Sequence, residues 1–134
     1  MSTSRIVYLG NLRTENTHLL SGNSYYTDAP LDNNGKGEAF SPTDTVATGL
    51  ANCMLTVMGI KAQNMAISID GTIAEVTKFM ESEPRRISKI EVILTFPKGI
   101  DDKSKKILEN TARTCPVAQS LHPEIEQIIR FNWK

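Results

Sequence analysis

The chain contains few of the residues that build disulfide frameworks or metal sites. It has two cysteines and two histidines among 134 residues. Neither cysteine has a histidine or another cysteine beside it at metal-ligand spacing, and two thiols do not make the disulfide framework of a small secreted domain. The pair, Cys53 and Cys115, therefore predicts thiol chemistry rather than a metal site or a structural staple.

An excess of charge is also missing, since 15 basic residues balance 15 acidic ones. The positive field that drives binding to phosphate backbones is absent, so a nucleic-acid partner is not expected. The sequence also lacks an apolar run that we expect to span a bilayer, and residues 1–20 lack the apolar core of a leader. We therefore expect a soluble, cytoplasmic protein without a membrane partner, folded as a single domain over residues 1–134.

The N-terminal part of the chain alternates short β-favouring runs with turn residues. Strands are predicted over residues 5–9, 12–20 and 24–27, with a turn at 21–23. The polar, glycine-bearing segment 32–37 follows. This loop is either a simple connector or the rim of a site.

The sequence Ser41-Pro42-Thr43-Asp44 predicts the start of a long helix. Serine is the N-cap, proline occupies the first helical position, and the aspartate completes a capping box. From there to about Lys61 the residues are apolar nearly all round. Because one sheet of a small domain covers only part of such a helix, we expect a homodimer.

Two further strands, a helix and a last strand are predicted in the C-terminal part. The strands cover 66–80 and 85–96, and the first is interrupted at Asp70-Gly71, which suggests a bulge or bend. A helix begins at 101–102 and breaks at 114–116, and a short helical turn and a final strand ending near Trp133 follow. This order of strands and helices predicts an α+β fold.

The residues alone give a ranking of the two thiols. Cys53 lies 12 residues beyond Ser41, which is about 18 Å along a helix and too far for the helix dipole to activate it. Taken alone, Cys53 is best interpreted as an inert core cysteine. Cys115 precedes Pro116 at a helix N-cap, where backbone N–H groups favour a thiolate. By this reasoning Cys115 is the more acidic thiol.

The motifs together resemble those of the family of osmotically inducible protein C (OsmC) and the organic hydroperoxide resistance (Ohr) proteins. The matching segments are Ser41-Pro42-Thr43-Asp44 leading into Ala51-Asn52-Cys53, Thr114-Cys115-Pro116-Val117, and the strand opening Gly10-Asn11-Leu12-Arg13. The spacing of 62 positions between the cysteines also fits. The resemblance spans essentially the whole chain.

This resemblance implies an OsmC-like α+β fold, with antiparallel sheets wrapped around long central helices in an intertwined homodimer. It also implies a thiol peroxidase in which Cys53 is the peroxidatic and Cys115 the resolving cysteine, which reverses the ranking above. Cys53 would reduce an organic hydroperoxide and become a sulfenic acid, and Cys115 would convert it to a disulfide. A dithiol reductant, lipoyl-type by family analogy, would reset the pair without a metal, flavin or nucleotide cofactor.

Supporting residues are assigned from the same resemblance. Arg13 is the expected partner of the thiolate, with Arg5 as the fallback, and a solvated strand residue is the alternative for Arg13. The family's hydroperoxide reductases carry a glutamate directly after the helix-opening proline, where this chain has Thr43. Asp44 and Glu38 are the candidate replacements, although Asp44 is also the capping carboxylate.

A rival hypothesis from another class is a non-catalytic or ligand-binding relative that keeps the dimer and an apolar pocket. Thr43 in place of glutamate favours this rival, whereas two cysteines at these two places favour the peroxidase. A Cys-His hydrolase is less favoured, because it would need His122 near a thiol.

Overall fold

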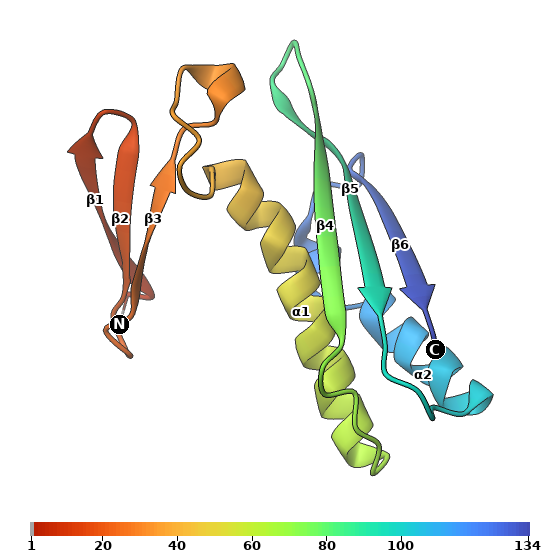
Figure 1. Cartoon of the computed structure of the whole chain (residues 1–134). Coiled ribbons are helices and arrows are strands. Elements are labelled where there is room, and N and C mark those ends of the chain that lie inside the picture. The colour runs from red at the N-terminus through yellow and green to blue at the C-terminus, as the bar shows by residue number, and fades with distance from the viewer. Residues whose placement is uncertain (1) are drawn as a thin grey trace. The chain divides into compact units, whose positions relative to one another are not determined.

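The computed structural model describes residues 2–134 and shows two compact units, Met1–Val46 and Ala47–Lys134 (Figure 1). The first unit carries one three-stranded sheet, and the second carries another. Helix α1, Pro42–Asn64, begins in the first unit and continues into the second. The mixture of helices and two small sheets confirms the predicted α+β class.

The sheet of the first unit is fully antiparallel. It contains β1 (Ser4–Gly10), β2 (Arg13–His18) and β3 (Ser24–Asp28), in that spatial order. The second predicted strand ends at His18 rather than at position 20, because the Gly22 N–H already donates to the His18 carbonyl. A short 3-10 helix, η1 (Leu31–Asn33), lies in the loop that follows β3.

The predicted capping box at the start of α1 is confirmed. The Asp44 backbone N–H donates to Ser41 Oγ at 3.0 Å, and the Ser41 N–H donates to Asp44 Oδ2 at 2.9 Å. These two bonds satisfy donors that a helix start leaves unpaired. The helix then runs to Asn64, beyond the predicted end at Lys61. Its buried residues are Ala47, Leu50, Ala51, Met54, Met58 and Ala62.

One expectation about α1 is wrong. Among residues 2–134 it is the one helix that is long and apolar enough to cross a membrane, with a mean hydropathy of 1.2 over its best window. Core helices of soluble proteins meet the same criterion, so this finding is weak evidence for a membrane span.

The second unit is built on a sheet of β4 (Ile73–Glu81), β5 (Arg86–Thr95) and β6 (Glu126–Asn132). The predicted strand 66–80 begins only at Ile73, because Asp70 and Gly71 form a turn before it, and the irregularity of β4 lies between Phe79 and Met80. β4 and β5 pair antiparallel as expected.

The pairing of β6 departs from the antiparallel sheets that the resemblance implied, because β6 runs parallel to β5. Parallel neighbours need a crossover connection. Helices α2 (Asp102–Arg113) and α3 (Pro116–Ser120) lie between β5 and β6 in the chain and supply it.

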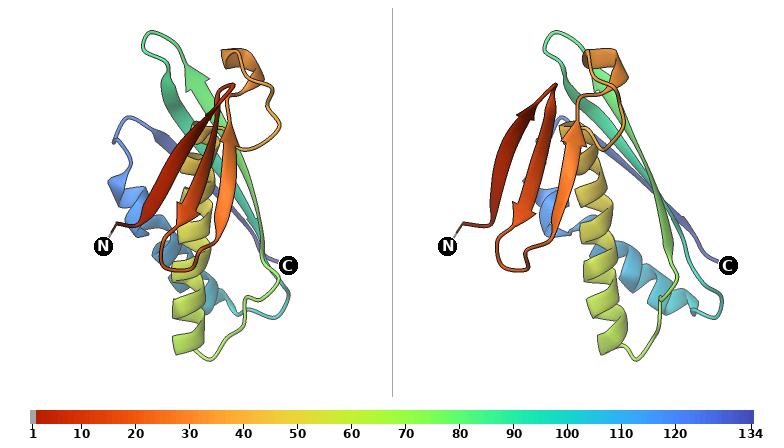
Figure 2. Two further views of the ribbon diagram at one scale, coloured as in Figure 1. Left: turned by 90° about the vertical axis from the view of Figure 1, so that its left-hand side faces the viewer. Right: turned by 60° about the vertical axis from the view of Figure 1, so that its left-hand side comes forward.

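Helices α1 and α2 cover the same face of this sheet (Figure 2). The alternation predicted for β5 is confirmed, since every second side chain from Ile90 to Phe96 is at most 1% exposed. Leu108 of α2 packs into the same core, which also contains Cys115. The core therefore fixes the C-terminal end of α2 and the start of α3, and Cys115 lies between them.

Candidate active site

The two thiols, far apart in sequence, meet in the second unit. Cys53 is on α1, half-buried, and packs against the hydrophobic core. Cys115 is the N-cap residue of α3 and is 1% exposed. Both cysteines are free, and their side chains interact directly.

Backbone groups hold Cys115 in place. The Ala118 N–H donates to Cys115 Sγ at 3.4 Å, and the Cys115 N–H donates to the Ala112 carbonyl at 3.4 Å. The predicted N-cap position is therefore confirmed. The Cys115 sulfur is fixed between the end of α2 and the first turn of α3.

The expected acidity of Cys115 is wrong. Burial raises the pKa of the Cys115 thiol, and its hydrogen bond and charge interaction with Cys53 raise that pKa further. The Ala118 N–H acts in the opposite direction but is outweighed. A thiolate placed in an apolar core loses its hydration, which the N–H groups of Ala118 and Val117 do not replace.

The interaction with Cys53 favours the protonated form of Cys115. A hydrogen bond that raises a pKa is made by the protonated form of the group. Cys115 therefore stands as a protonated thiol beside Cys53.

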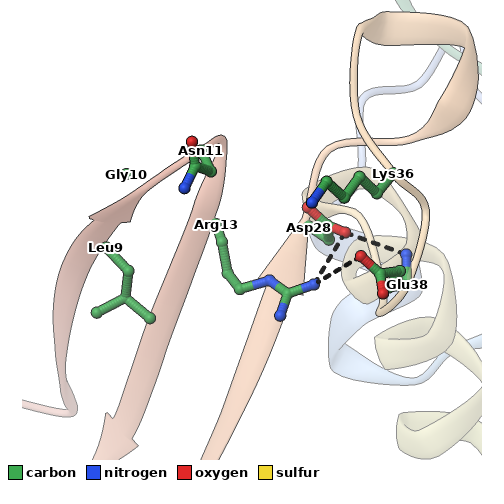
Figure 3. A pocket seen from close by; sticks show the side chains of 7 residues that line it. All are labelled: Leu9, Gly10, Asn11, Arg13, Asp28, Lys36 and Glu38. Atoms are coloured by element: carbon green, nitrogen blue, oxygen red, sulfur yellow. Dashed lines mark hydrogen bonds and ion pairs between the residues drawn. The ribbon is translucent and has the colours of Figure 1, made fainter.

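A charged cluster lies in the first unit, around Arg13 of β2 (Figure 3). Arg13 Nη2 is 3.2 Å from Asp28 Oδ2 and 3.5 Å from Glu38 Oε1. The Glu38 backbone N–H also donates to Asp28 Oδ2, at 3.1 Å. Asp28 is 1% exposed. The Glu38 N–H, followed by Arg13, holds the pKa of the Asp28 carboxyl below its ordinary value despite burial.

The cluster borders a small pocket of about 190 Å³. Its lining residues are Leu9, Gly10, Asn11, Arg13, Asp28, Lys36 and Glu38. The Arg13 side chain is 37% exposed, so its guanidinium is partly open to solvent. Arg13 is therefore more than the solvated strand residue of the alternative hypothesis, because a buried carboxylate holds it.

The other candidate residues lie in different surroundings. Arg5 is exposed on β1 opposite Thr17, outside the Arg13 cluster. Asp44 is engaged in the capping box with Ser41, and Thr43 Oγ1 lies 3.2 Å from Ser41 Oγ. Of the two candidate replacements for the missing glutamate, Glu38 pairs with Arg13, and its side chain is 59% exposed.

The sequence reading missed Asp28. The signal was available in the predicted hairpin, because a turn at 21–23 sets the register of β2 and β3. That register places Asp28 directly opposite Arg13. Among residues 2–134 no group of three or more histidine, cysteine, aspartate or glutamate residues is arranged to hold a metal ion.

Comparison with known proteins decides the family. The model of the family described as OsmC-like protein matches residues 35–129. This chain belongs to the OsmC-like family. The match begins after Arg13 and Asp28, so it covers both cysteines but not the N-terminal sheet.

Solved structures of OsmC-like proteins resemble the chain over nearly its full length. A protein from Psychrobacter arcticus 273-4, provisionally described as an osmotic stress induced and detoxification response protein, is 57% identical. The similarity covers 98% of this chain and 96% of that protein, with a TM-score of 0.95. No curated protein matches the sequence.

Two more distant structures share the OsmC-like fold. The organic hydroperoxide resistance protein OsmC from Legionella pneumophila is 14% identical, with a TM-score of 0.76 over 98% of both chains. The organic hydroperoxide resistance protein OhrB of Bacillus subtilis is 17% identical, with a TM-score of 0.69 over 98% of both chains. The predicted OsmC/Ohr family and OsmC-like fold are thus confirmed, and the family includes hydroperoxide-resistance proteins.

Proposed function

We propose that this protein is a thiol-dependent peroxidase that reduces organic hydroperoxides, with Cys53 as the peroxidatic and Cys115 as the resolving cysteine. The observation that carries the proposal is the direct interaction between two free thiols, a half-buried Cys53 on α1 and a buried Cys115 at the start of α3 whose pKa is raised. Membership of a family that includes hydroperoxide-resistance proteins supports the same reaction.

The first step of the proposed reaction is a two-electron oxidation of Cys53. Its thiolate attacks the outer oxygen of the hydroperoxide, an S–O bond forms, and the O–O bond breaks. The alkoxide that leaves takes a proton and departs as the alcohol. Cys53 becomes a sulfenic acid, and the hydroperoxide has been reduced.

The second step uses the neighbouring thiol. Cys115 sulfur attacks the Cys53 sulfenic acid, so that an S–S bond forms and water leaves. An external dithiol then reduces the disulfide by thiol exchange and is itself oxidised to a disulfide. A lipoyl-type dithiol fits this role, and the need for a reductant favours a reducing compartment such as the cytoplasm.

A homodimer is part of the proposal, because the first unit leaves many apolar side chains uncovered. Those on β1, on β3 and in the turn between β1 and β2 are Ile6, Val7, Tyr8, Leu9, Leu12, Tyr25 and Tyr26, each 45–64% exposed. Four of them are consecutive on β1, so both faces of this strand carry uncovered apolar groups. Light scattering should give twice the chain mass of 14.8 kDa. A mass of one chain at micromolar concentration would refute the dimer.

Mass spectrometry of the intact protein tests the peroxidase. After one equivalent of an alkyl hydroperoxide, the reduced protein should lose the mass of two hydrogen atoms as the disulfide forms. The Cys115→Ser variant should instead gain one oxygen, trapped as a sulfenic acid at Cys53. An unchanged mass of the native protein would exclude the reaction.

The rival function, a non-catalytic binding relative, is favoured by Thr43. The structure adds that Asp44, the nearest carboxylate to that position in sequence, is engaged in the helix cap. The same experiment separates the two functions, because a binding protein would leave both thiols reduced.

A further inference from the structure

We propose that Gln127 is a positioning residue for Cys115. Its side-chain amide ties the short helix α3 to β6 and so keeps the Cys115 sulfur beside Cys53 for closure of the disulfide. This tether, the hydrogen bond from Gln127 Nε2 to the Ala118 carbonyl, lies wholly within the second unit. The inference rests on the proposed peroxidase function for the sulfenic acid that Cys115 resolves, but the tether itself is measurable without any hydroperoxide.

Gln127 is a polar residue on the apolar face of β6. Ile129 and Phe131 follow it at the two-residue spacing of one strand face, and both pack against the core. Gln127 also pairs with Ile90 of β5, which is 0% exposed, and residues paired across a sheet point to the same side. A polar group on such a face costs stability unless it is hydrogen-bonded. The hydrogen bond of Gln127 is therefore the feature to explain.

The partner of Gln127 is one of the last carbonyls of α3. Gln127 Nε2 donates to the Ala118 carbonyl at 3.0 Å, across nine positions of the chain. The carbonyls at the end of a helix have no donor within the helix, and a helix of five residues is marginal by itself. The tether therefore attaches α3 to the sheet and supplies a donor that α3 lacks.

Ala118 also contacts the sulfur that must react. Its N–H donates to Cys115 Sγ at 3.4 Å, and the Gln119 N–H donates to the Cys115 carbonyl at 3.1 Å. Ala118 thus links the sulfur to the sheet, with its N–H on Cys115 and its carbonyl on Gln127. Because Cys115 interacts with Cys53, a displacement of α3 moves one sulfur relative to the other.

The step that needs this positioning is the second one of the proposed reaction. The Cys115 sulfur attacks the sulfenic sulfur of Cys53, an S–S bond forms and the S–O bond breaks, and the thiol proton leaves with the hydroxyl as water. Two sulfurs form this bond only in a narrow geometry. Holding them there makes closure a well-oriented intramolecular step. It also leaves less time for a second hydroperoxide to oxidise the sulfenic acid to a sulfinic acid.

Gln127→Met tests the tether, because methionine keeps the length of glutamine and removes the donor. Rapid-quench mass spectrometry of the reduced, full-length protein follows both steps at a tert-butyl hydroperoxide concentration where the first step is the faster. Loss of reduced protein reports oxidation of Cys53, and loss of two hydrogen atoms reports closure. Gln127→Met should slow closure about threefold or more, change the first step less than about twofold, and raise the yield of sulfinic acid. A smaller effect on closure overturns the proposal, and so does an equal slowing of both steps, which a merely structural role would give.

Gln119→Met is the matched control. Gln119 Nε2 donates to the Thr114 carbonyl at 2.6 Å, so it makes the same kind of bond in the same segment, but this bond is exposed and does not reach the sheet. Water replaces an exposed donor, so closure should change less than about twofold. If Gln119→Met slows closure as much as Gln127→Met does, any substitution near α3 impairs closure, and the tether is overturned.

Thiol exchange separates the tether from the peroxidase function. The equilibrium of Cys53 and Cys115 with reduced and oxidised glutathione measures how well the two sulfurs are held for each other. Gln127→Met should shift this equilibrium toward the reduced pair by about threefold or more, and Gln119→Met should not; a smaller shift in Gln127→Met overturns the tether. If the shift is found but the native protein does not react with hydroperoxide, the peroxidase function fails and the tether stands. If the native protein reacts and Gln127→Met closes at the native rate, the reverse holds.

A measurement on the native protein applies even where Gln127→Met does not fold. In the reduced protein the ¹⁵N heteronuclear NOE of the Gln127 side-chain amide should report a rigid group, clearly above that of Gln63, which is exposed on α1. Equal values for the two amides would overturn the tether.

Discussion

Oxidation of the two thiols is predicted to stabilise the folded chain. A disulfide between Cys53 and Cys115 would close a loop of 62 residues. By the chain-entropy relation, the loss of freedom in the unfolded state is worth about 4 kcal/mol at 25 °C. The hydrogen bond between the two thiols and the one from the Ala118 N–H to Cys115 Sγ are weakened or lost, at about 0.5–1 kcal/mol each. The net gain in the free energy of unfolding is therefore about 2–3 kcal/mol, or roughly 10 °C in Tm.

Urea unfolding of the reduced and oxidised protein measures this gain. Diamide forms disulfides without a peroxide, so the result does not depend on peroxidase activity. The Cys115→Ser variant, treated in the same way, should show no shift. All samples need the same protein concentration, because an oligomer would make the midpoint depend on it. A gain below about 1 kcal/mol, well under the value expected from loop closure, or a loss of stability, would refute the idea that the two sulfurs meet without distorting the fold.

Further predictions concern single side chains. Cys53→Ser should reduce hydroperoxide consumption to the uncatalysed rate in a thiol-coupled assay, and consumption above that rate would exclude Cys53 as the nucleophile. The resemblance assigns Arg13 to the thiolate of Cys53, and a partner of that kind is worth about 1.5–3 kcal/mol. Arg13→Ala should on this hypothesis slow Cys53 oxidation roughly tenfold or more; an unchanged rate would show that Arg13 is the wrong arginine. Ser41→Ala should cost about 1 kcal/mol of stability in urea through loss of the helix cap, without changing the rate of Cys53 oxidation. The pKa of the Asp28 carboxyl is lowered in the folded state, so the ionised carboxylate stabilises the fold at neutral pH. This stabilisation is lost as the pH falls below about 4, the ordinary pKa of an aspartate, and then through the lower pKa of the folded state. The drop in stability between pH 5 and pH 3 should therefore be smaller in Asp28→Asn than in the native protein, and an equal drop would show that this carboxylate does not carry it.

Features that depend on short sequence patterns could be predicted well. The capping box at Ser41 and Asp44 is specified by residues three apart, and both of its hydrogen bonds form. The buried face of β5 follows from a strict two-residue alternation around Val92, and it is buried as expected. In each case the local pattern and the final environment agree, so the sequence is sufficient.

Features that depend on pairing between distant segments could not be predicted from the sequence. Nothing in the residues of β6 (Glu126–Asn132) says whether it runs parallel or antiparallel to β5, because strand direction is set by where α2 and α3 deliver the chain. Asp28 escaped notice for a related reason. It is the last residue of β3 and is followed by a loop, and its importance becomes visible only when the register brings Arg13 opposite it.

The acidity of Cys115 shows most clearly what the sequence leaves out. Its N-cap position was predicted correctly, and the Ala118 N–H does donate to its sulfur. That donor is a local effect, readable from Cys115-Pro116. Burial and the neighbouring Cys53 are non-local effects, and together they outweigh the local one in setting the pKa of Cys115. The reason is that transferring a thiolate out of water costs more free energy than its backbone N–H donors supply. In the proposed reaction this order is what the chemistry requires, since a resolving thiol that keeps its proton does not compete with Cys53 for the hydroperoxide.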